Sequence, residues 1–131
     1  MKKSLVYPLL LGSLLLAGCS TSQPIQNINH EQIALTLNQE QVERAIMQGG
    51  KQKGWTMQRA EPGLIHGTIT VRSHQATIKV PYTNRDFSIL YVSSKGLDDE
   101  GHGTIHRNYN KWVTLLDQAI RLELNSAANG Q

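Results

Sequence analysis

Leu64-Ile65-His66-Gly67-Thr68-Ile69-Thr70-Val71-Arg72 alternates apolar or small residues with polar ones at a period of two. In a β-strand, this period sends alternate side chains to opposite faces of the sheet. Ile65 and Ile69 then share a dry face, and Thr68 and Thr70 share a wet one. The stretch therefore predicts a strand in a sheet with one buried face and one open face.

Neighbouring segments extend this strand into a meander. Glu61-Pro62-Gly63 places Pro before Gly, as a type II turn requires, and joins a preceding strand at 55–60. A polar turn at 73–75 leads to a third strand at 76–82, and a second polar turn at 83–86 leads to a fourth at 87–93. We predict four antiparallel strands in sequence order.

Two amphipathic helices flank the meander. Asn38 with Gln41 has capping-box spacing and predicts a first helix over 39–53, with Gly54 just beyond its end. Apolar residues at i, i+3, i+4 and i+7 predict a last helix from Tyr109 to about residue 125, with Asn108 as its cap. The simplest packing is an α+β, two-layer domain with both helices on the dry face of the four-stranded meander.

The start of the chain has the pattern of an export signal. Lys2 and Lys3 precede an apolar run from Leu5 to Leu16, and small residues precede Cys19, the single cysteine. Leu16-Ala17-Gly18-Cys19 resembles the lipobox of bacterial lipoproteins. That resemblance implies removal of residues 1–18, lipidation of Cys19 and anchoring to a membrane through the acyl chains. In bacterial lipoproteins, an aspartate directly after the lipidated cysteine signals retention at the inner membrane. This chain has Ser20 at that position. It therefore resembles lipoproteins that follow the default route to the periplasmic face of the outer membrane.

Removing residues 1–18 from the 131 leaves 113, enough for one domain. Residues 19–32 are polar and predict a flexible tether that reaches about 15 to 20 Å from the bilayer. We expect a single α+β domain at 33–125 and a disordered tail at 126–131. Without Lys2 and Lys3, the chain has 11 basic and 10 acidic residues, and this near balance argues against nucleic-acid binding.

The wet face of the sheet is the candidate partner-binding surface. A polar sheet face on a membrane-anchored domain favours a non-catalytic binding or accessory role, with an envelope protein as partner. The residues expected on this surface are His66, Thr68, Thr70, Arg72, Thr77 and Lys79.

A metal site is the alternative, because oxygen and imidazole ligands gather in one loop at Asp98, Asp99, His102 and His106. Their spacing matches neither an EF-hand loop nor a paired zinc motif. No Gly-x-Ser-x-Gly elbow or phosphate-binding glycine loop is present, so the sequence offers no catalytic residues and no cofactor site, and the enzyme question stays open.

Residues 105–112 read Ile-His-x-x-Tyr-Asn-x-Trp. This motif resembles a group of small Gram-negative lipoproteins without an established activity, which implies a shared fold and compartment. His106, Asn108 and Asn110 lie at the start of the predicted last helix, where their side chains can cap the helix or hold the preceding loop.

Overall fold

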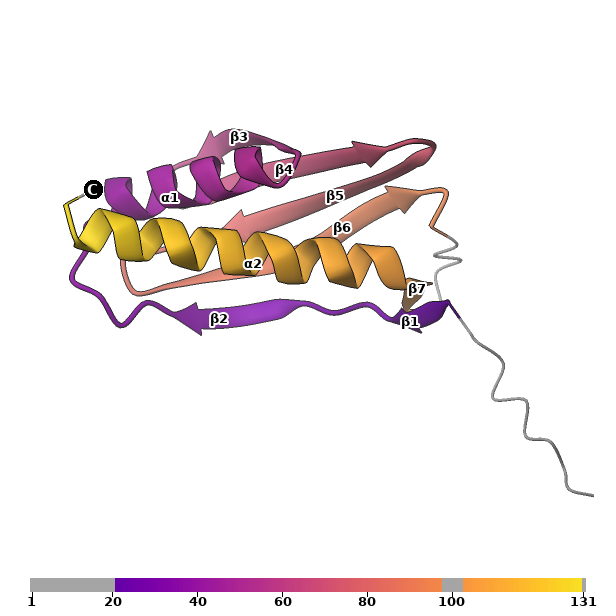
Figure 1. Cartoon of the computed structure of the whole chain (residues 1–131), viewed down its shortest axis with the longest axis horizontal. Helices are drawn as coiled ribbons and strands as arrows, with labels where there is room; N and C mark the ends of the chain where they lie inside the picture. The colour runs from indigo at the N-terminus through magenta and orange to yellow at the C-terminus, as the bar shows by residue number, and fades with distance from the viewer. Residues whose placement is uncertain (1–20, 98–102, 131) are drawn as a thin grey trace, which may run out of the picture.

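The computed structural model describes residues 21–97 and 103–130. They form an α+β domain with nine elements in chain order (Figure 1). The elements are β1 (Ser22–Pro24), β2 (Ile28–Gln32), α1 (Gln39–Gln52), β3 (Trp55–Glu61), β4 (Leu64–Val71), β5 (His74–Pro81), β6 (Asp86–Lys95), β7 (Thr104–His106) and α2 (Arg107–Ala128).

The main sheet has five antiparallel strands in the order β2-β6-β5-β4-β3. The predicted four-stranded meander corresponds to strands β3 to β6 of this sheet. The prediction of four strands was wrong, because β2 pairs with the free edge of β6. α1 joins β2 at one edge to β3 at the other, so the chain crosses one face of the sheet between them.

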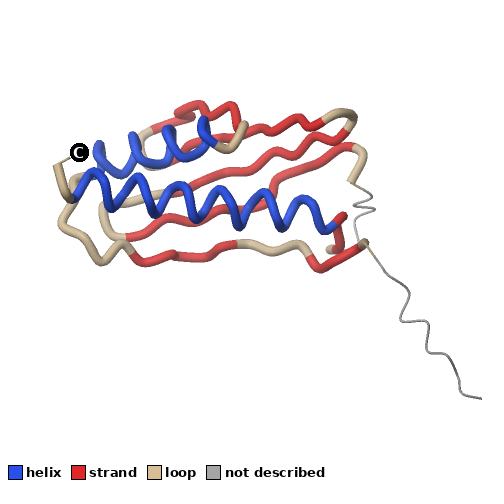
Figure 2. Tube along the Cα trace, viewed as in Figure 1, coloured by secondary structure: helices blue, strands red, loops and turns tan. Residues whose placement is uncertain are grey.

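Both helices lie over the same face of the sheet (Figures 1 and 2). The core between the layers takes its apolar side chains from both. Val42 and Ile46 of α1, Ile120 of α2, and Ile65 and Ile78 of the sheet are fully buried in one cluster. The alternation along β4 and β5 thus sets which face the helices cover.

α1 begins where the sequence predicts and ends one residue earlier, at Gln52. Asn38 Oδ1 accepts from the Gln41 N–H at 2.8 Å, and Gln41 Oε1 accepts from the Asn38 N–H at 2.9 Å, which completes the capping box. Gly54 follows the helix with φ +84°, a left-handed conformation that glycine adopts at little cost.

The two glycines inside α1 allow close packing. A Cβ on Gly49 would lie 2.9 Å from the backbone nitrogen of Ile120, and one on Gly50 would overlap the Met57 side chain. Gly49 therefore lets α2 approach α1, and Gly50 leaves room for β3. Both glycines have low helix propensity, but a larger residue would push α1 away from α2 at Gly49 and away from β3 at Gly50.

The segment expected to be a tether is largely ordered. Ser22–Pro24 pairs with Thr104–His106, and Ile28–Gln32 pairs with β6. The interpretation of 19–32 as a flexible tether was wrong for these strands, because backbone and side-chain amide hydrogen bonds hold a sequence that buries little apolar surface. The Asn110 side chain accepts from the Gln26 N–H at 3.0 Å and donates to the Pro24 carbonyl at 2.9 Å.

α2 is longer at both ends than the sequence predicts. It begins at Arg107, and its N-cap is His106, whose Nδ1 accepts from the Asn108 N–H at 3.1 Å. The expectation of Asn108 as the cap was therefore wrong. The helix continues to Ala128, where a disordered tail was expected, and Leu124 and Ala127 pack against the core.

A bulge interrupts the alternation of β6 at Val92. Ile78 pairs with Tyr91 but Thr77 pairs with Ser93, so Val92 is an extra residue and is 49% exposed. Beyond the bulge Ser94 pairs with Ala76, and its hydroxyl lies 2.8 Å from that of Tyr91.

Candidate functional site

The open face of the sheet carries polar side chains in rows that cross the strands. In register, Thr56, Thr68, Thr77 and Ser93 form a row of hydroxyls from β3 to β6. Cross-strand neighbours in antiparallel sheets stand about 5 Å apart, so this row can hydrogen-bond along an extended partner.

Two further rows flank the hydroxyls. One contains Gln58, His66, Lys79 and Leu90, and the other contains Thr70, Gln75 and Lys95. The Gln75 side-chain amide lies 3.4 Å from the Thr70 hydroxyl. The structure thus brings together five of the six residues predicted for this surface: His66, Thr68, Thr70, Thr77 and Lys79.

Arg72 does not lie in these rows. The ladder of β4 and β5 closes with Val71 opposite His74, which leaves Arg72 and Ser73 as a two-residue turn. Arg72 has φ +57°, in the region that favours glycine, and it is exposed. It extends the open face only at its rim.

The rows contain no carboxylate. Two of the acidic residues that the structure describes lie on strands of the open face but outside the three rows, Glu61 at the end of β3 opposite Leu64 and Asp86 at the start of β6. The others lie on β2, α1 and α2: Glu31, Glu40, Glu43, Asp117 and Glu123. Lys79 and Lys95 are the charged members of the rows, and His66 adds an imidazole. The face therefore offers hydroxyl, amide and cationic donors together with hydroxyl and amide acceptors.

Of the four candidate metal ligands, His106 alone belongs to the residues that the structure describes. Asp98, Asp99 and His102 lie outside the residues that the structure describes. His106 is described, and its Nδ1 caps α2. Within 21–97 and 103–130, no three His, Cys, Asp or Glu side chains form a group suited to a metal ion.

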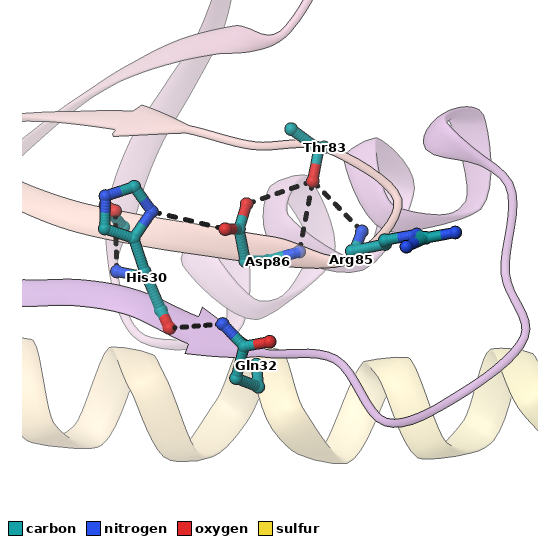
Figure 3. A network of polar contacts seen from close by, with 6 residues as sticks. His30, Gln32, Thr83, Arg85 and Asp86 are labelled. Atoms are coloured by element: carbon teal, nitrogen blue, oxygen red, sulfur yellow. Dashed lines mark hydrogen bonds and ion pairs between the residues drawn. The ribbon is translucent and has the colours of Figure 1, made fainter.

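A histidine–carboxylate pair lies at the β2 edge (Figure 3). His30 Nδ1 is 3.2 Å from Asp86 Oδ2, and the Thr83 hydroxyl donates to Asp86 Oδ1 at 3.0 Å. Such a pair is the base half of a hydrolase triad, but the Thr83 hydroxyl contacts the carboxylate instead of the imidazole. The His30 side chain is 77% exposed. The arrangement ties β2 to the β5–β6 turn and has no nucleophile in place.

His30 also marks a bulge in β2. It has φ +50°, and its N–H donates to the Ser88 hydroxyl at 2.9 Å instead of to a β6 carbonyl. Sequence reasoning missed β2 because its residues are mostly polar. The partner side of the pair lies in the predicted turn at 83–86, where the Thr83 hydroxyl accepts from the Arg85 and Asp86 N–H groups.

The helix layer holds a buried carboxylate. Asp117 is 8% exposed, and its Oδ2 lies 3.1 Å from Arg121 Nη2 while its Oδ1 has no hydrogen-bond partner. Burial raises the pKa of Asp117, the positive charge of Arg121 opposes that rise, and the negative charge of Glu31 adds to it. This group lies away from the polar rows and serves the packing of α2.

No family model, curated sequence or solved structure matches this chain. Neither α1 nor α2 combines the length and apolar composition that a membrane-crossing helix needs, and the described residues contain no other long helix. The function is therefore inferred from the chain's own residues.

Proposed function

We propose that this chain is a lipid-anchored protein of the outer membrane, facing the periplasm, whose open sheet face binds an envelope protein without turning over a substrate. The anchor is Cys19, on the strength of the Leu16-Ala17-Gly18-Cys19 motif behind an apolar run. The binding surface consists of the three polar rows of β3 to β6.

The composition of those rows is the observation that carries the binding proposal. A surface that serves solubility mixes acidic and basic side chains, whereas a face of one charge sign favours a partner of complementary charge. Here carboxylates are absent from the rows, although seven stand elsewhere among the described residues. Thr68 and Thr77 are half-buried by their neighbours, so their positions are fixed before a partner arrives.

The partner chemistry follows from the same rows. Lys79, Lys95 and His66 disfavour a strongly basic surface, and the hydroxyls suit a polar backbone or side-chain surface of neutral or acidic character. Stacked aromatic residues, as a sugar-binding face would use, are absent from these rows. A protein surface is therefore the favoured occupant.

In-cell photo-crosslinking tests the proposal. A photoreactive amino acid is placed at Thr68, Thr70 or Lys79, and adducts are identified by mass spectrometry. Gln48 and Gln118 are the controls, because both are exposed on the helix layer. One defined protein adduct from the sheet face alone supports the proposal. No adduct, or the same adducts from both layers, overturns it.

A further inference from the structure

The β4–β5 turn, the end of β6 and the start of α2 lie at the same end of the molecule (Figure 1), and each of them carries a basic residue. Arg72 lies in the β4–β5 turn, Lys95 ends β6, and Arg107 and Lys111 lie in the first turns of α2. All four are exposed, and none forms an ion pair with another described residue. The partial positive charge of the α2 N-terminus adds to them.

The acidic residues that the structure describes lie away from this end. They fall at the end of β2, in the first turns of α1, at the end of β3, at the start of β6, and at the middle and near the end of α2. Asp98, Asp99 and Glu100 lie outside the described residues. Among the described residues, this end therefore carries basic side chains without acidic ones, whereas basic and acidic side chains are mixed over the rest of the domain.

The same end has an apolar hollow between the β4–β5 turn and α2. Its apolar lining comes from Val71, Trp112 and Leu115, and the polar residues Arg72, His74, Asn108 and Lys111 complete the lining. Val71 is 40% exposed, and Trp112 is half-buried. Tryptophan and aliphatic groups surrounded by Lys and Arg are the composition of surfaces that lie against lipid headgroups.

The chain enters the domain at this end. The Arg107 N–H donates to the Thr21 carbonyl at 2.7 Å, and β1 begins at the next residue, Ser22. Between Cys19 and Ser22 there are two residues, which span at most about 10 Å. An acylated Cys19 therefore holds the start of α2 close to the bilayer.

We propose that this basic end, made of Arg72, Lys95, Arg107 and Lys111 around the Val71–Trp112 hollow, rests on the anionic phospholipid headgroups of the bilayer that holds the anchor. This inference rests on the lipidation of Cys19 proposed above. The strands run along the long axis, and eight residues of β5 span about 26 Å. The sheet then stands upright on the membrane, with its polar rows facing sideways toward a partner.

Site-directed spin labels at the two ends of β5 test this orientation. Ser73→Cys lies in the turn before the strand and Asn84→Cys in the turn after it, and both positions are exposed. Cys19 is the only native cysteine, and its thiol is consumed by the lipid, so each label is unique. The full lipidated protein is placed in vesicles of phosphatidylethanolamine and phosphatidylglycerol, and power saturation with a water-soluble nickel complex reports exposure.

We expect the label at 73 to lose accessibility to the nickel complex on vesicle attachment, while the label at 84 keeps that of the free protein. Equal accessibility at both sites, or a loss at 84, would overturn the orientation. Mass spectrometry of the same sample shows whether Cys19 is acylated. An unacylated protein that does not attach refutes the anchor and this inference with it, whereas an acylated, attached protein without the loss at 73 refutes the orientation alone.

A charge-reversal pair separates headgroup contact from mere proximity. Arg107→Glu with Lys111→Glu is expected to restore nickel accessibility at 73. The matched control, Lys51→Glu with Arg85→Glu, makes the same change in net charge away from the basic end and is expected to leave the loss intact. The same loss at 73 in both variants would contradict a role for the basic residues.

Discussion

The two faces of the sheet carry side chains from the same strands yet differ in what fixes them. Toward the helices, Ile65 and Ile78 are fully buried in the core cluster together with residues of α1 and α2. On the open side, Thr68 and Thr77 are fixed only by the strands that carry them. Stability therefore resides on the covered face, which leaves the open face available for a partner.

Adjacent residues of β5 give the sharpest test of that division. Ile78→Ala removes a fully buried side chain and is expected to lower the free energy of unfolding by about 2 to 5 kcal/mol, as such substitutions do in other protein cores. Thr77→Val keeps the shape and the β-branch on the open face and is expected to change stability by less than about 0.5 kcal/mol. Urea unfolding of both variants checks this. Equal losses would show that the open face also contributes to the core.

Gly49 tests whether the helix layer depends on close approach. Gly49→Ala improves helix propensity by about 1 kcal/mol, but its Cβ would lie 2.9 Å from the Ile120 backbone nitrogen. Because backbone cannot rotate away, we expect a net loss of about 1 to 3 kcal/mol. Gln48→Ala, one residue earlier and exposed, is the control. A stabilised Gly49→Ala would mean that α1 and α2 can separate at no cost.

Asn110 tests how the start of the chain is held. Its side chain donates to the Pro24 carbonyl and the Gln23 side chain and accepts from the Gln26 N–H. Asn110→Ala removes three hydrogen bonds, each of which contributes about 0.5 to 1.5 kcal/mol net, and we expect a loss of about 1 to 3 kcal/mol with faster amide exchange at Gln26. Asn125→Ala, exposed on the same helix, serves for comparison. Unchanged exchange at Gln26 would contradict the clamp.

Asp117 tests the pH dependence of the covered side. Its pKa is raised in the folded state, first by burial, so this carboxyl stabilises the fold below about pH 4, and that contribution is lost as pH rises through the raised pKa. Asp117→Asn removes this dependence, and the free energy of unfolding should then fall less between pH 4 and 7. Urea titrations at stepped pH measure it. An unchanged slope would mean that Asp117 titrates alike in both states.

The period-two pattern of Leu64–Arg72, the Pro-Gly turn and the Asn38 capping box predicted β3 to β6 and α1, because each is a local signal whose outcome tertiary contacts reinforce. β2 could not be predicted from its polar residues, because it pairs with β6 across more than fifty residues of chain. The α2 cap was misplaced because His106 is an unusual cap, and its role depends on β7 ending beside it.

The residues of the candidate surface divide in the same way, into those that local alternation predicts and those that require the pairing of distant strands. Alternation placed His66, Thr68, Thr70, Thr77 and Lys79 on one face, since register preserves period-two patterns. Arg72 has the same parity but lies beyond the last ladder pair. The contributions of Thr56, Gln58 and Ser93 required the register of β3 and β6, including a bulge that shifts Ser93 onto the open face.

Lysine labelling in intact cells tests the central claim, that a partner covers the open face, most directly. A small acetylating reagent is applied to cells and to the purified protein, and modification of Lys79 is compared with that of Lys51 and Lys53, which are exposed at the end of α1. We predict that Lys79 reacts less in cells than in the purified protein, while Lys51 and Lys53 react alike in both. Equal modification of Lys79 in cells and in solution would contradict the account.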